Sequence, residues 1–144
     1  MKKLLLCISL LAAFMPLCAQ TADQTPFKGY LFNKEHDVFM RINFYEQDVV
    51  ITWQELCGPL PGFLAKNGNS YCWIVSSADI HDNRAELVMV NDTGSEDLTA
   101  RLTQQNDSTY TLQQLSGSPI KVSVNGKLRK LPQNLVFIRK NAGR

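Results

Sequence analysis

The sequence predicts an all-β fold, most simply an eight-stranded antiparallel meander barrel, with a β-sandwich as the alternative. Three observations lead to this prediction. Apolar and polar residues alternate with a period of two along 38–45, 84–90 and 98–103, as expected for half-buried strands. Asn-Gly pairs in Lys66–Asn69 and at Asn125–Gly126 favour tight hairpin turns. The runs also follow one another at regular spacing, which is typical of barrels and sandwiches.

The individual elements follow from residue type and period. β-branched and aromatic runs predict strands, and clusters of Gly, Asn, Asp, Ser and Pro predict the turns between them. No apolar spacing of i, i+3, i+4 continues beyond two turns, so helix should be confined to a turn or two. The predicted strands are 38–45, 49–53, 71–75, 84–90, 98–103, 109–115, 120–124 and 135–140, and the turns are 46–48, 66–69, 82–83, 105–108, 116–119 and 125–126.

The first nineteen residues have the layout of a secretory signal peptide. Lys2 and Lys3 precede an apolar run from Leu4 to Phe14, and Ala19 ends the segment before Gln20. The apolar run is too short to span a bilayer, which argues against an uncleaved anchor. A lipoprotein signal fits poorly, because leucine precedes each cysteine of the segment. We therefore expect a signal peptide over 1–19 and one exported domain over 20–144, in the periplasm, on the outer surface or in the extracellular space.

Charge excludes one class of partner and points to another. The chain has fifteen Lys and Arg against thirteen Asp and Glu, so removal of Lys2 and Lys3 leaves a formally neutral domain. We therefore expect no nucleic-acid partner. Basic residues dominate the C-terminal quarter, where they either protect exposed strand edges or form a basic face for an anionic glycan, a lipid headgroup or an acidic partner. These residues are Lys121, Lys127, Arg129, Lys130, Arg139, Lys140 and Arg144.

Two cysteines, Cys57 and Cys72, remain after the signal peptide. In an exported domain the simplest expectation is one structural disulfide. Fourteen residues separate them, and closing such a loop contributes about 3 kcal/mol in the chain-entropy model. A metal or redox pair is the alternative, but the C-x-x-C spacing is missing and no histidine is close in sequence.

The sequence contains no motif for catalysis or for a cofactor, so we expect a non-enzymatic protein without cofactor or metal. Its two histidines, His36 and His81, lie beside predicted turns, although Asp79 and His81 share a strand face as two metal ligands would. The acidic loop Asn91–Asp97 is interpreted as a turn, with Ca²⁺ binding as the alternative. Ser108, within Asp107-Ser108-Thr109, resembles an O-glycosylation site of exported Bacteroidota proteins.

The segment after Trp53 is the most unusual one. Its prolines fix φ, its glycines permit tight bends, and it carries apolar side chains. A rigid loop of this kind loses little entropy on binding, so it suits recognition of a ligand or a partner. The alternative, which we favour, is that its apolar side chains plug one mouth of the barrel. The residues concerned are Pro59, Leu60, Pro61 and Phe63.

In length, cleavage context and succession of hairpins the chain resembles the small exported lipocalin-like barrel proteins of Bacteroidota. Gly58–Gly62 and Asn91–Leu98 add to the resemblance, whereas Lys28–Leu31 lacks the Gly-x-Trp of true lipocalins. The resemblance implies the fold and the compartment, but no ligand. We expect a monomeric binding protein that holds a small apolar or amphipathic ligand at the barrel mouth. The alternative is a protein-binding module, such as a protease or lysozyme inhibitor, acting through Gly58–Phe63.

Overall fold

A computed structural model describes residues 25–141, so the predicted signal peptide and Arg144 lie outside the described residues. Residues 25–141 form strands and one short 3₁₀ helix, η1 (Glu55–Cys57). No helix in this part of the chain is long and apolar enough to cross a bilayer. The strands are β1 (Lys28–Asn33), β2 (Val38–Asn43), β3 (Gly62–Lys66), β4 (Cys72–His81), β5 (Arg84–Asn91), β6 (Asp97–Gln104), β7 (Thr109–Gly117), β8 (Lys121–Val124), β9 (Lys127–Lys130) and β10 (Asn134–Lys140).

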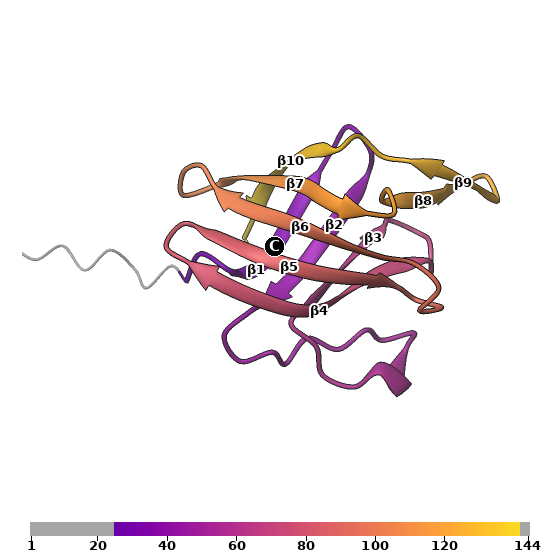
Figure 1. Cartoon of the computed structure of the whole chain (residues 1–144), viewed down its shortest axis with the longest axis horizontal. Coiled ribbons are helices and arrows are strands. Elements are labelled where there is room, and N and C mark those ends of the chain that lie inside the picture. Colours follow the sequence, from indigo (N-terminus) through magenta and orange to yellow (C-terminus); the bar gives the residue numbers. More distant parts are fainter. Residues whose placement is uncertain (1–24, 142–144) are drawn as a thin grey trace, which may run out of the picture.

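Eight of these strands close into an antiparallel barrel in the order β1-β10-β7-β6-β5-β4-β3-β2. Each strand pairs with its neighbour along the chain, except that β10 closes the barrel between β7 and β1. β8 and β9 form a separate hairpin between β7 and β10, which extends from one end of the barrel (Figure 1). The predicted meander barrel is thus confirmed, and both Asn-Gly pairs join antiparallel neighbours as predicted.

Alternation along the strands fills the inside of the barrel with apolar side chains. In β5, for example, Ala85, Leu87 and Met89 point inward and are buried, whereas Val88 is exposed. An eight-stranded barrel has an interior just wide enough for such side chains. They form one core, made of Phe27, Leu31, Val38, Met40, Ile42, Phe44, Leu64, Trp73, Val75, Ala85, Leu87, Met89, Leu98, Ala100, Leu102, Tyr110, Leu112, Ile120, Val122, Leu131, Leu135 and Phe137.

Apolar side chains also close the end from which β8 and β9 extend. Ile120, Val122 and Leu131, from the excursion between β7 and β10, join the core. The Trp73 indole N–H at the start of β4 donates a hydrogen bond of 2.9 Å to the Lys121 carbonyl, which fixes β8 across this end. These three residues, and not the predicted loop, therefore close this end of the barrel.

Aromatic rings occupy the opposite end. Phe27 precedes β1 and Phe44 follows β2, and their rings stack with centroids 5.8 Å apart. Tyr110, at the start of β7, meets Phe27 edge-on at 6.3 Å. The N-terminal segment is therefore part of the core rather than a loose leader to β1.

Two predictions about the β2–β3 connection are wrong. The β-branched run 49–53 does not form a strand, since only Val49 pairs, in one isolated bridge to Leu60. Conversely, Gly62–Lys66, which we assigned in part to the rigid loop, is β3. Strand propensity measures how well a side chain fits a half-buried surface. Ile51 finds that surface by packing on the outside of the barrel, without joining the sheet.

Candidate binding surface on the outside of the barrel

The connection between β2 and β3, residues 44–61, covers part of the outer barrel surface. A second apolar cluster, separate from the core, lies beneath it, so β3 is buried on both faces. Figure 1 shows the connection along one side of the barrel. Because both sides of this contact are apolar, its burial holds the connection against the barrel. The buried members of the cluster are Ile51, Phe63, Ala65, Cys72 and Ile74, with Phe39, Val49, Cys57, Leu60 and Val90 partly buried around them.

Polar contacts fix where the connection leaves and rejoins the sheet. The buried Asn43 side chain donates to the Asp48 carboxylate at 2.8 Å and accepts from the backbone N–H of Glu46 at 3.0 Å. Val49 and Leu60 exchange two backbone hydrogen bonds of 2.8 and 3.0 Å. Farther along, the Trp53 indole N–H donates to the Ser70 carbonyl at 2.9 Å. These bonds hold the connection at both ends and in the middle.

The structure places the four predicted loop residues differently from either expectation. Phe63 is 2% exposed and packs edge-on against Phe39 and Trp53 at centroid distances of 5.7 and 5.6 Å. It neither plugs a barrel mouth nor stands at a loop tip. Leu60 is half-buried in the same outer cluster, Pro61 is buried, and Pro59 is exposed. The loop closes the outer face of β3 and β4, because its apolar residues meet apolar side chains there.

Other side chains of the connection are the exposed ones. Leu56, at the centre of η1, is 105% exposed, and Val50 and Trp53 are 47% and 42% exposed. Tyr45 is exposed to a similar degree. Sequence reasoning placed Tyr45, Val50 and Trp53 in predicted strands and singled out none of the four as a surface residue. One signal could have found Val50, Trp53 and Leu56: each is an apolar residue in a segment that does not show the apolar–polar alternation of a half-buried strand.

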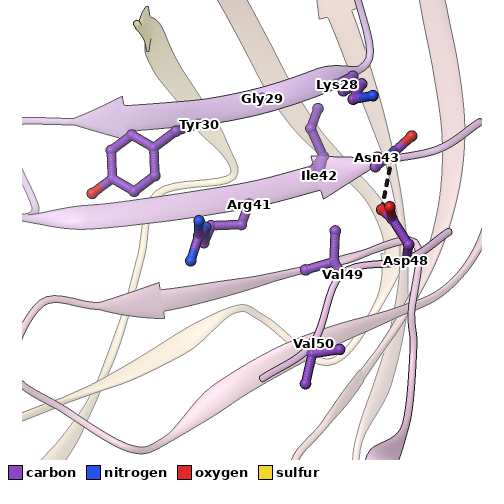
Figure 2. A pocket seen from close by; sticks show the side chains of 9 residues that line it. All are labelled: Lys28, Gly29, Tyr30, Arg41, Ile42, Asn43, Asp48, Val49 and Val50. Carbon is purple, nitrogen blue, oxygen red and sulfur yellow. Dashed lines mark hydrogen bonds between the residues drawn. The ribbon is translucent and has the colours of Figure 1, made fainter. Parts of the chain in front are cut away.

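A groove of about 370 Å³ runs beside this connection (Figure 2). One wall is the outer face of β1 and β2, and the other is the segment Asp48–Val50. Tyr30 and Arg41 lie directly opposite each other in the sheet, and no ion pair of Arg41 occurs among residues 25–141. Partial burial raises the pKa of Tyr30 above its ordinary value. The groove thus offers a free guanidinium beside a neutral phenol.

The two cysteines are free thiols in the structure, so the predicted disulfide is not formed there. Cys72 is buried in the outer cluster, and Cys57 packs against that cluster from η1. Burial, with a contribution from the Asp92 carboxylate, raises the pKa of the Cys72 thiol to about 12. Such a thiol is protonated at neutral pH and therefore a poor nucleophile.

The predicted basic face is not one surface. Arg139 reaches the end of the barrel opposite the hairpin, where its guanidinium donates to the carbonyls of Lys28 and Thr25 at 2.8 and 3.2 Å. The Lys140 ammonium lies 4.1 Å from the centre of the Phe32 ring. Lys121 pairs with Glu96 at 2.7 Å. Only Lys127, Arg129 and Lys130 remain together, on the exposed strand β9. The basic face was one of two alternatives for these cations, and they are separated because the chain leaves the barrel sheet between β7 and β10.

The remaining predicted positions lie in turns or at the strand ends beside them. The Asn91 side chain builds the acidic loop by donating to Ser95 at 3.0 Å and accepting from the Glu96 backbone N–H at 3.1 Å. The His81 imidazole lies 3.0 Å from the Asp79 carboxylate, and residues 25–141 contain no group of three or more side chains placed to hold a metal ion. Ser108 is exposed in the β6–β7 turn, where its hydroxyl lies 3.2 Å from Asn106.

Fold and surface together define a closed meander barrel of the lipocalin-like architecture, with its interior filled and an apolar connection held on its outside. No protein-family model matches the chain, and no curated protein or solved structure matches it significantly.

Proposed function

We propose that this protein is a non-enzymatic binding protein that recognises a protein partner through the β2–β3 connection. One observation carries the proposal: an anchored connection exposes Tyr45, Val50, Trp53 and Leu56. Exposed apolar side chains gathered on one segment are typical of protein-interaction sites. Because the connection is already fixed against the barrel, it loses little conformational entropy on binding.

The filled interior favours a protein over a small ligand at the barrel mouth. Ligand sites in proteins are concave and bury most of the ligand surface. Here Ile120, Val122 and Leu131 occupy one end, and Phe27 and Phe44 occupy the other. The connection, in contrast, presents Leu56 on the outside of the molecule. A projecting apolar side chain is suited to enter a partner's cleft, as in an enzyme inhibitor.

The compartment follows from the predicted signal peptide over 1–19, which assigns the partner to the extracytoplasmic space. The resemblance to exported lipocalin-like proteins supports the same assignment. In an oxidising compartment, we propose that a disulfide-forming oxidant accepts two electrons from the Cys57 and Cys72 thiols, which release two protons and form one bond. Both cysteines belong to the apolar cluster on the outside of the barrel, and this closeness supports the step. The bond would tie η1 to the start of β4 and stiffen the recognition segment.

Site-specific photo-crosslinking tests the partner proposal. A photoreactive residue is placed at Leu56, and a matched one at Val88, which is exposed on β5 on the outer barrel surface. In the cells that export the protein, we expect a discrete protein adduct from position 56 and none from position 88. A photoreactive residue at Trp53 should also give an adduct. This adduct should disappear when Val50→Ser and Leu56→Ser are introduced into the same protein. Adducts of equal yield from 56 and 88, or none from either, would contradict the proposal.

A further inference from the structure

The β8–β9 hairpin stands apart from the barrel ladder. β9 pairs only with β8, so its outer edge is free. Asn125 and Gly126 have φ values of 52° and 75°, which is the conformation of a tight type I′ turn. Val122 of β8 packs into the barrel core, and Trp73 bonds to the Lys121 carbonyl. The hairpin is therefore firmly based on the barrel and points its outer strand into solvent (Figure 1).

β9 presents three cations that no internal contact accounts for. Lys127, Arg129 and Lys130 are exposed, and none forms an ion pair with another residue of 25–141. The nearby Lys121 differs, because it pairs with Glu96. Three like charges within four residues repel one another, so the sequence carries a local electrostatic cost that a partner of opposite charge would relieve.

The exposed side chain of Leu128 distinguishes a binding surface from a strand edge that is only protected against aggregation. Charged residues on a free strand edge prevent aggregation, but an apolar residue between them works against that purpose. Leu128 is 55% exposed. Because side chains alternate along a strand, Leu128 and Lys130 lie on one face of β9, and Lys127 and Arg129 lie on the other. An exposed apolar side chain on a free strand that carries cations on both faces matches the boundary of an anionic lipid bilayer, where the apolar group enters the acyl region and the cations meet phosphates.

We propose that the β8–β9 hairpin docks this protein onto an anionic lipid bilayer, with Leu128 inserted at the headgroup boundary and Lys127, Arg129 and Lys130 on the phosphates. The surface lies apart from the β2–β3 connection in the fold, so it does not depend on the protein-partner proposal. A formally neutral domain would thereby be held at a membrane by one local feature and could present its apolar connection away from the lipid.

Vesicle flotation tests this inference with the protein from Gln20 onward. Vesicles made of equal parts phosphatidylglycerol and phosphatidylcholine should bind the protein at about 0.1 M salt and release it at about 1 M salt, where the Debye length shrinks to roughly 3 Å. Vesicles of phosphatidylcholine alone should not bind it. Equal binding to both vesicle types, or binding that is insensitive to salt, would overturn the inference without any variant being needed.

Variants locate the surface. Lys127→Gln, Arg129→Gln and Lys130→Gln together should weaken binding by on the order of 100-fold, since each cation near an anionic surface contributes about fivefold in affinity. The matched control is Lys34→Gln, Arg84→Gln and Lys140→Gln, three exposed cations outside β9, which should bind within about twofold of wild type. Leu128→Ser should lower the affinity for anionic vesicles about tenfold. Leu115→Ser, at an exposed position of β7, should leave this affinity unchanged.

Two outcomes of the variants would refute the inference. An equal loss in both cation triples would show a diffuse charge effect, and unchanged affinity of Leu128→Ser would exclude insertion. Binding of an acidic protein with no binding of anionic vesicles would assign the hairpin to a protein partner instead.

Discussion

Arg139 shows how one residue can be misjudged from its chemical type. As a cation on the last strand it was counted in a basic face, yet its guanidinium holds the N-terminal segment against the barrel. It donates to backbone carbonyls of Thr25 and Lys28 and covers the Tyr110 ring, with 5.4 Å to the centroid. Gly29 makes this approach feasible: its φ is +141°, and a Cβ there would lie 3.3 Å from the guanidinium.

Replacement of Arg139 should therefore cost stability. The variant Arg139→Lys keeps the positive charge. The lysine ammonium lacks the planar set of N–H donors with which the guanidinium binds several carbonyls at once. We expect a loss of about 2 kcal/mol in the free energy of unfolding, because hydrogen bonds to charged groups contribute about 1.5–3 kcal/mol each. Urea denaturation measures it. Lys140→Met, at the exposed neighbouring position, should cost at most about 1 kcal/mol, the contribution of an exposed cation–π contact, and equal losses in both variants would contradict this role of Arg139.

The Cys72 thiol should be protected in a pH-dependent way. Its pKa of about 12 lies above the ordinary 9.0, so folding favours the neutral form. The associated stability is fully present below pH 9 and is lost as the pH rises toward 12. In the reduced protein at pH 8, an alkylating reagent should modify half-buried Cys57 first and Cys72 only after unfolding. Intact-mass measurement counts the modified sites, and faster modification of Cys72 would be inconsistent with its burial.

Without reductant, protein produced in an oxidising compartment should carry no modifiable thiol if the proposed disulfide forms. Intact mass before and after reduction should then differ by two hydrogen atoms. Two thiols that alkylate in the unreduced, unfolded protein would disprove the bond and leave the fold account unaffected.

At the scale of elements, the β2–β3 connection combines residues of opposite roles within a few positions. Phe63 is buried, whereas Leu56 is exposed. Phe63→Ser should cost about 3–5 kcal/mol, the range found when large aromatic side chains are lost from packed cores. Leu56→Ser should leave the unfolding free energy within about 0.5 kcal/mol of wild type. Thermal melts distinguish the two, and a comparable loss for Leu56→Ser would mean that Leu56 is not free for a partner.

Strands with clear alternation and turn chemistry could be predicted from the sequence, as β2, β5, β6, β7 and β10 show. The Asn-Gly turns were equally predictable, because few residues tolerate positive φ. Val49–Trp53 and β3 could not be assigned, since a doubly buried strand has no alternation and an outer apolar segment resembles a strand. The groove between β1, β2 and Asp48–Val50 depends on how the β2–β3 connection packs against the barrel. No local sequence pattern could therefore predict it.

For the whole molecule, the decisive feature is that the barrel interior is filled by its own side chains. The core runs from Phe27 and Tyr110 at one end to Ile120 and Leu131 at the other. A carrier barrel needs an enclosed, mostly apolar cavity for its ligand. This chain instead uses its interior for stability and places exposed apolar and basic groups on the outside, on the β2–β3 connection and on β9.

Native mass spectrometry with small apolar probes, such as benzene derivatives and medium-chain fatty acids, tests the filled interior most directly. Leu102, fully buried in the core, provides the positive control: Leu102→Ala should open a void, cost about 2–5 kcal/mol and admit a benzene-sized probe, as engineered apolar cavities do. We predict that the wild-type protein forms no one-to-one complex with any probe. A stoichiometric complex of the wild-type protein that Ile120→Trp, at the closed end, abolishes would contradict the account and restore the ligand-carrying barrel.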